Sequence, residues 1–185
     1  MENAVNQLER QERVVPGILG AVLFSLAGGV AWFLLWQAGI VAGLSGCIGV
    51  ICAIKGYEIF SKGSSIKGVV IASVAAIAVI VLAWYLCIGY DYYLTMEELA
   101  AENPLYFEAI PLSDCLFNGF EFFDFCDKLD LPEIRTEYLG DLAFGLIFTV
   151  IAAIGYVVSA VKNAKFAKTN VPAAPTLNGE QNPEA

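Results

Sequence analysis

The side chains that most often carry enzyme chemistry are scarce in this sequence of 185 residues, which has no histidine. Imidazole bases, histidine metal ligands and Ser-His or Cys-His nucleophile pairs are therefore excluded. Neither the phosphate-binding pattern Gly-x4-Gly-Lys-Ser nor the dinucleotide pattern Gly-x-Gly-x-x-Gly occurs. We therefore expect a non-enzymatic protein with no cofactor and no nucleic-acid partner.

The cysteines are the next side chains able to react. The chain has five, and two of them, Cys115 and Cys126, lie eleven residues apart in a segment expected outside the membrane. A disulfide between them would stabilise the fold by on the order of 3 kcal/mol. Two free thiols are the equal alternative. No Cys-x-x-Cys pair or histidine completes four zinc ligands, so no zinc site is expected.

Carboxylates supply two further candidates. Asp141 is the one acid expected inside an apolar span, where an ionisable group is a candidate for proton or cation relay. Its place near the end of that span favours a simpler role as a helix-end anchor. Asp124, Asp127 and Asp130 recur every three residues, which would gather them on one helical face. The calcium loop with its central glycine is missing, so we expect a solvated acidic face and no metal.

Hydropathy indicates which elements must position these side chains. Hydrophobic residues make up 58% of the chain and charged residues 16%, and the mean hydropathy is +0.66. A helix needs about 20 apolar residues to cross a hydrocarbon layer roughly 30 Å thick. The stretches Val14 to Trp36 and Val69 to Tyr90 meet this need without any charge. The sequence therefore predicts an all-α, four-helix transmembrane bundle with spans over residues 14–37, 39–60, 68–90 and 138–161.

The lysines and arginines predict the orientation of these spans. Eight of the ten lie in the N-terminal arm at 1–13, in or beside the connection at 61–67, or in the tail at 162–185. Basic residues in short flanks stay on the cytosolic side. We therefore expect a multi-pass plasma membrane protein with both termini in the cytosol. The tail has three prolines and no aromatic residue after Lys168, and we expect it to be disordered.

The connection between the second and third spans carries Lys55, Lys62 and Lys67 against Glu58 alone. We interpret these lysines as topology determinants. The alternative is that they also attract anionic lipid, which is worth about 1 kcal/mol for each basic group. Tryptophans at the opposite ends of the helices, Trp32, Trp36 and Trp84, are expected to act as interfacial anchors.

Residues 91–137 form an acidic, phenylalanine-rich segment with twelve acids against Lys128 and Arg135. Thr95 is expected to cap a short helix that ends near Glu102, and Pro132 to open a new helix that continues into the fourth span. The phenylalanines favour a small helical or irregular extracellular cap on the bundle. The alternative is an interfacial helix on the outer leaflet.

Small residues predict how the first two spans pack. Gly39, Gly43 and Gly46 recur at a spacing that allows close helix approach, and Gly17 and Gly28 match them in the first span. We expect an intramolecular contact, with self-association as the alternative.

Two stretches, "KGYEIFSKGSSIKGVVI" at Lys55 to Ile71 and "YLGDLAFGLIFTVIAAIG" at Tyr138 to Gly155, resemble a group of small, uncharacterised bacterial integral membrane proteins. The resemblance implies four spans and no known activity. We expect an interaction or assembly subunit that contacts membrane lipids and an unknown membrane protein or a second copy of itself. The alternative is a small transporter or channel component for cations or protons, using Asp141 and the acids of residues 91–137.

Overall fold

The computed structural model describes residues 13–40, 44–63 and 65–169, and every regular element among them is a helix. The N-terminal arm before residue 13, Gly43 and the tail after residue 169 lie outside the described residues. The helices are α2 (Val14–Gln37), α3 (Ser45–Ser61), α4 (Ile66–Glu102), α5 (Leu112–Phe117), α6 (Glu121–Lys128) and α7 (Glu133–Thr169).

Three of these helices are long and apolar enough to cross a membrane: α2, α4 and the part of α7 up to Ser159. The first of them occupies the residues predicted for the first span, Val14 to Gln37. The predicted second span is shorter than expected, because α3 begins at Ser45 and has only 17 residues. At about 1.5 Å per residue it is roughly 26 Å long, just under the thickness of a hydrocarbon core. Gly39 lies outside it, in a turn with φ +68°.

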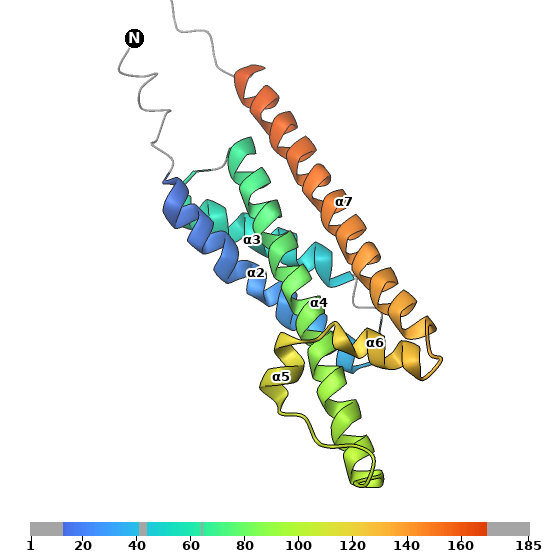
Figure 1. Ribbon diagram of the computed structural model, residues 1–185. Coiled ribbons are helices and arrows are strands. Elements are labelled where there is room, and N and C mark those ends of the chain that lie inside the picture. The colour runs from blue at the N-terminus through green and yellow to red at the C-terminus, as the bar shows by residue number, and fades with distance from the viewer. Residues whose placement is uncertain (1–12, 41–43, 64, 170–185) are drawn as a thin grey trace, which may run out of the picture.

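The four long helices run alternately up and down, as Figure 1 shows. α3 and α4 each pack against the other three helices of the bundle, whereas α2 and α7 lie on opposite sides of them. We call the end with α5 and α6 the cap end. The other is the turn end, where α3 connects to α4 through Lys62, the residue whose left-handed conformation (φ 56°) ends α3. Ser65 caps α4 there by accepting a hydrogen bond from the Gly68 N–H at 3.0 Å.

Glycines bring α2 and α3 into direct backbone contact. A Cβ atom on Gly20 would collide with the Gly56 carbonyl oxygen, and one on Gly28 would collide with the Cα atom of Gly49. Both pairs fit one antiparallel register, so α2 and α3 pack closely within the chain. Of the small residues named from the sequence, Gly17 and Gly28 of α2 take part in this contact, whereas Gly39 has no atom within 4 Å of its Cβ position. Gly46 has a different neighbour, because a Cβ atom there would meet the Gly145 carbonyl oxygen of α7.

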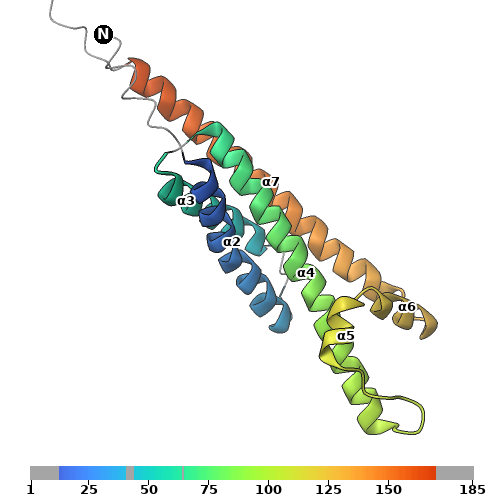
Figure 2. The ribbon, with the colours of Figure 1, turned by 60° about the vertical axis from the view of Figure 1, so that its left-hand side comes forward.

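α4 corrects the prediction of a separate short helix after the third span. It continues without a break from Ile66 to Glu102, and the Thr95 hydroxyl donates to the Asp91 carbonyl at 2.8 Å, so Thr95 does not cap a new helix. Tyr92 and Met96 are buried in this part of α4, in the same hydrophobic cluster as residues of the cap. That burial keeps the helix intact where its sequence turns polar. Figure 2 shows the end of α4 projecting past every other helix.

α7 begins after Pro132, as predicted, and runs unbroken to Thr169. Residues 162–169 are therefore helical, where the sequence analysis placed the start of a disordered tail. Alanine, lysine and other good helix formers in this stretch allow the helix to continue beyond the bundle (Figure 1).

The phenylalanine-rich segment forms a packed cap, as favoured over the interfacial helix. Phe122 and Phe123 are buried, and both rings contact the ring of Tyr138 on α7, with centroids 6.2 and 5.6 Å away. Tyr92 of α4 packs against Phe122 at 5.7 Å. α6 thereby joins α4 to the start of α7.

Candidate functional site

A carboxylate lies among aromatic side chains at the cap end of the bundle. Asp91 Oδ2 accepts a hydrogen bond from Trp36 Nε1 at 2.7 Å and another from the Tyr138 hydroxyl at 2.5 Å. The Trp36 and Tyr138 rings contact each other with centroids 4.6 Å apart. Trp84 completes the group, because its Nε1 donates to the Tyr138 carbonyl at 2.8 Å. This Asp91 cluster (Trp36, Trp84, Asp91 and Tyr138) ties α2, α4 and α7 together.

This role of Asp91 was not predicted from the sequence. Asp91 was expected as the first residue outside the third span, but both of its donors lie on other helices, 55 and 47 residues away. Trp84 and Trp32 are buried in the core, so neither serves as the interfacial anchor that was predicted. The seven-residue spacing of Trp84 and Asp91 placed them on one helical face, and that spacing was the only available signal.

Asp141, the predicted intramembrane acid, lies half-buried one helical turn after Glu137. The two carboxylates line a small polar hollow of about 140 Å³ together with Trp36, Gly39 and Ile40. The hollow opens at the cap end, so Asp141 is at the end of its span and not at the bundle centre. This position agrees with the helix-end anchor.

The three predicted aspartates of the acidic face are not equivalent. The Arg135 guanidinium pairs with Asp127 at 2.6 Å and with Asp124 at 3.6 Å. Asp130 sits in a turn with φ 60° and follows the end of α6. Among the residues that the structure describes, no group of three or more cysteine, aspartate or glutamate side chains could hold a metal ion.

The three lysines at the turn end differ in their contacts. Lys55 forms an ion pair with Glu58 at 2.8 Å, and the Tyr156 hydroxyl of α7 donates to the same carboxylate at 2.8 Å. The Lys55 ammonium lies 5.5 Å from the centre of the Tyr156 ring. Lys62 and Lys67 are exposed. Lys55 therefore helps to join α3 to α7, whereas the other two lysines face outward.

Cys115 and Cys126 are free thiols in the structure, and both are buried in the cluster beneath the cap. Burial raises the pKa of each thiol, and the adjacent acids Asp114 and Asp127 add to the effect. Since the thiolate is the reactive form, these cysteines are protected from reaction while the cap is folded. The disulfide between them stays a prediction.

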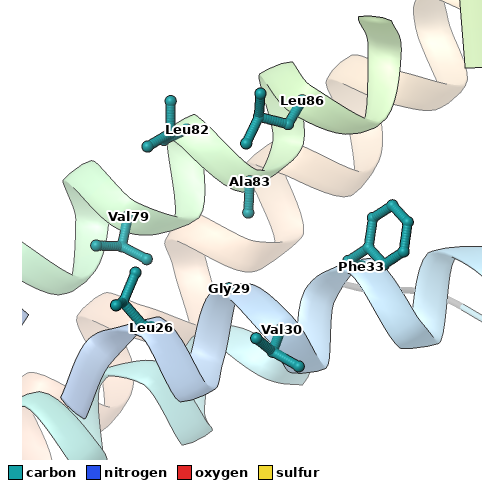
Figure 3. Close-up of a pocket in the computed structure, with 8 residues that line it drawn as sticks. All are labelled: Leu26, Gly29, Val30, Phe33, Val79, Leu82, Ala83 and Leu86. Atoms are coloured by element: carbon teal, nitrogen blue, oxygen red, sulfur yellow. The ribbon is translucent and has the colours of Figure 1, made fainter. Parts of the chain in front are cut away.

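An apolar groove lies between α2 and α4 and has a volume of about 270 Å³. Figure 3 shows its lining, in which Gly29 leaves space between Leu26 and Phe33 of α2 and the facing side chains of α4. All eight lining residues are apolar: Leu26, Gly29, Val30, Phe33, Val79, Leu82, Ala83 and Leu86. Such a groove has no group that could polarise a substrate, and within a span it faces lipid.

The most exposed large apolar side chains lie between α4 and α6. Leu105 is 92% exposed, Tyr106 85% and Phe117 83%. Phe117 is the last residue of α5, and its carbonyl accepts a hydrogen bond from the Tyr85 hydroxyl at 2.8 Å. Leu105 and Tyr106 follow the end of α4. Exposed apolar side chains outside the spans are a candidate binding surface.

Comparison of the chain with protein-family models, with curated proteins and with solved structures finds no significant match.

Proposed function

We propose that this chain is a multi-pass plasma membrane protein with both termini in the cytosol, and that it acts as a non-enzymatic interaction or assembly subunit. The observation that carries this function is the exposure of Leu105 and Tyr106 in the cap, beyond the end of α4. Leaving such side chains in water is unfavourable, and a binding partner that covers them recovers the apolar burial.

In this proposal α3 is the fourth span. It packs against all three long helices, and its Gly46, Gly49 and Gly56 lie against the backbone of α2 or α7. Its length of 17 residues is sufficient because the Lys55 stem can extend toward the headgroups. The short connection through Lys62 then lies in the cytosol and the cap lies outside the cell.

Two measurements test the proposal. Purification of the tagged chain in mild detergent should recover a stoichiometric protein partner, whereas a chain that is recovered alone contradicts an assembly role. A cysteine introduced by Ser64→Cys should resist a membrane-impermeant maleimide in intact cells. Labelling of that cysteine from outside would contradict the proposed orientation.

A second function, a small transporter or channel component for cations or protons, is favoured by the polar hollow that Glu137 and Asp141 line. It requires flux through reconstituted liposomes that Asp141→Asn abolishes. The interaction subunit instead requires that Asp141→Asn leave partner recovery unchanged. The glycine contacts that hold α3 against α2 and α7 leave the described helices closely packed, which supports the interaction subunit.

A further inference from the structure

The exposed apolar side chains between α4 and α6 lie at two different heights relative to the membrane. Phe117 and Phe120 are beside Tyr85, whose ring lies 5.1 Å from that of Phe120 and whose hydroxyl donates to the Phe117 carbonyl. Tyr85 belongs to the charge-free stretch of α4. Lipid can therefore cover Phe117 and Phe120, just as it covers the groove between α2 and α4.

Leu105 and Tyr106 lie beyond the reach of lipid. Asp91 is the first charged residue after the apolar stretch of α4, and the helix continues to Glu102. The twelve residues from Asp91 to Glu102 extend α4 by about 18 Å beyond Tyr90. This exceeds the roughly 5–8 Å headgroup layer on each side of the hydrocarbon core. The two side chains are therefore in water, because they follow the end of α4 and are exposed. Figure 2 shows how far that end of α4 projects.

The turn that carries Leu105 and Tyr106 is held in place by the fold. The Tyr106 and Phe107 backbone N–H groups both donate to the Asn103 carbonyl, at 3.0 and 3.1 Å. Phe107 is half-buried, and its ring packs edge-on against Phe125 of α6 with centroids 6.5 Å apart. The backbone that carries the two exposed side chains therefore needs little ordering when it binds, and such preorganisation favours affinity.

Acids surround this turn without any basic residue near it in sequence. Glu98 and Glu102 are exposed in the last turn of α4, and Glu108 is exposed just after the turn. The chain has no lysine or arginine between Lys67 and Lys128. A complementary surface must therefore be basic, and two copies of this turn would repel each other.

We propose that the Leu105–Tyr106 turn anchors a protein partner on the same side of the membrane as the cap. The partner binds the two side chains in an apolar pocket that is bordered by lysine and arginine. This inference rests on the proposed function, because it names the partner surface of an interaction subunit. An aromatic anchor within a charged rim is the usual arrangement of a strong contact region.

The test uses the full-length tagged chain, purified in mild detergent from the cells that naturally produce it. The turn variant combines Leu105→Ser and Tyr106→Ser, and its control is Phe117→Ser, which alters an equally exposed side chain at lipid level. The charge variant combines Glu98→Lys and Glu102→Lys, which suit a helix C-terminus. Its control, Glu121→Lys with Glu133→Lys, makes the same change in charge away from the turn.

We expect the turn variant to weaken partner binding about 30-fold or more, the effect of removing a strong anchor residue. The charge variant and an increase in salt from about 0.1 to about 1 M should also weaken it, because the Debye length falls from about 10 to about 3 Å. Both controls should retain the partner. A photoreactive phenylalanine analogue at position 106 should crosslink to the same protein through its basic surface.

The alternative outcomes separate this inference from the proposed function. A partner that is recovered equally well with the turn variant overturns the inference and leaves the interaction subunit standing. Crosslinking from position 106 to a second copy, or to lipid alone, also overturns it. Recovery of the unmodified chain without any stoichiometric partner instead refutes the proposed function itself.

Discussion

Replacing Asp91 with alanine should loosen the cap end of the bundle, because this carboxylate joins three helices. Its Oδ2 atom accepts hydrogen bonds from Trp36 at 2.7 Å and from Tyr138 at 2.5 Å. Tyr138 is buried, so its hydroxyl loses its acceptor at a cost of about 2 kcal/mol. Trp36 is partly buried and can recover water, so its loss is nearer 1 kcal/mol. We expect Asp91→Ala to lower the free energy of unfolding by about 3 kcal/mol.

Equilibrium unfolding in mixed micelles, followed by tryptophan fluorescence, measures this loss. Asp141→Ala is the matched control, since Asp141 is half-buried at the same end of the bundle and lines an open hollow. We expect it to change the free energy of unfolding by less than about 0.5 kcal/mol. Tyr138→Phe removes one donor, and combining it with Asp91→Ala should reveal a coupling of about 1–2 kcal/mol.

Two results would refute the reasoning. One is that the Asp91→Ala and Asp141→Ala variants unfold at the same mole fraction of denaturing detergent in the mixed micelles. The other is strict additivity of Asp91→Ala and Tyr138→Phe, because residues joined by a hydrogen bond must be coupled.

Two further predictions concern packing and thiol reactivity. Gly20→Ala places a methyl group against the Gly56 carbonyl and should lower the free energy of unfolding by about 1–3 kcal/mol. Gly155→Ala is the control, because no atom lies within 4 Å of its Cβ position, and it should raise the free energy of unfolding by up to about 1 kcal/mol. Thermal unfolding in detergent distinguishes the two signs, and equal effects would contradict the close contact of α2 with α3. Cys115 and Cys126 have raised pKa values, so less of each thiol is present as the thiolate at a given pH. Maleimide should therefore label the two cysteines more slowly in the folded chain than in the unfolded chain. The labelling rate of the folded chain should increase above pH 8.5. Labelling that requires prior reduction even after unfolding would show that the two form the predicted disulfide and would contradict this free-thiol result.

The sequence predicted most accurately the features that depend on the solvent around each helix. The limits of α2 follow from an uninterrupted apolar run, because every backbone polar group in hydrocarbon must be bonded within its own helix. Pro132 marked the start of α7 because its missing N–H is tolerated in the first turn. The sequence also predicted that small residues pack the first two spans together, but in the structure Gly46 faces α7 and Gly39 has no atom within 4 Å of its Cβ position.

Local signals failed where tertiary packing decided the outcome. Thr95 has the chemistry of a helix cap, but the buried contacts of Tyr92 and Met96 with the cap favour an uninterrupted α4. The span predicted over residues 39–60 became the shorter α3, with Gly39 in a left-handed turn. Trp32 was predicted at the membrane surface and is instead fully buried.

By itself the sequence predicted a helical chain with four apolar spans, of which three are helices long and apolar enough to cross a membrane, and it showed that the acids gather between the last two spans. The composition of each segment and the spacing of its apolar residues carry this information, because they decide whether a helix face is stable in lipid or in water. Only the tertiary structure brought Asp91 to Trp36 and Tyr138, turned Phe122 inward, and left Leu105 and Tyr106 exposed. These contacts join residues that are far apart along the chain, and their partners are fixed by how the helices pack.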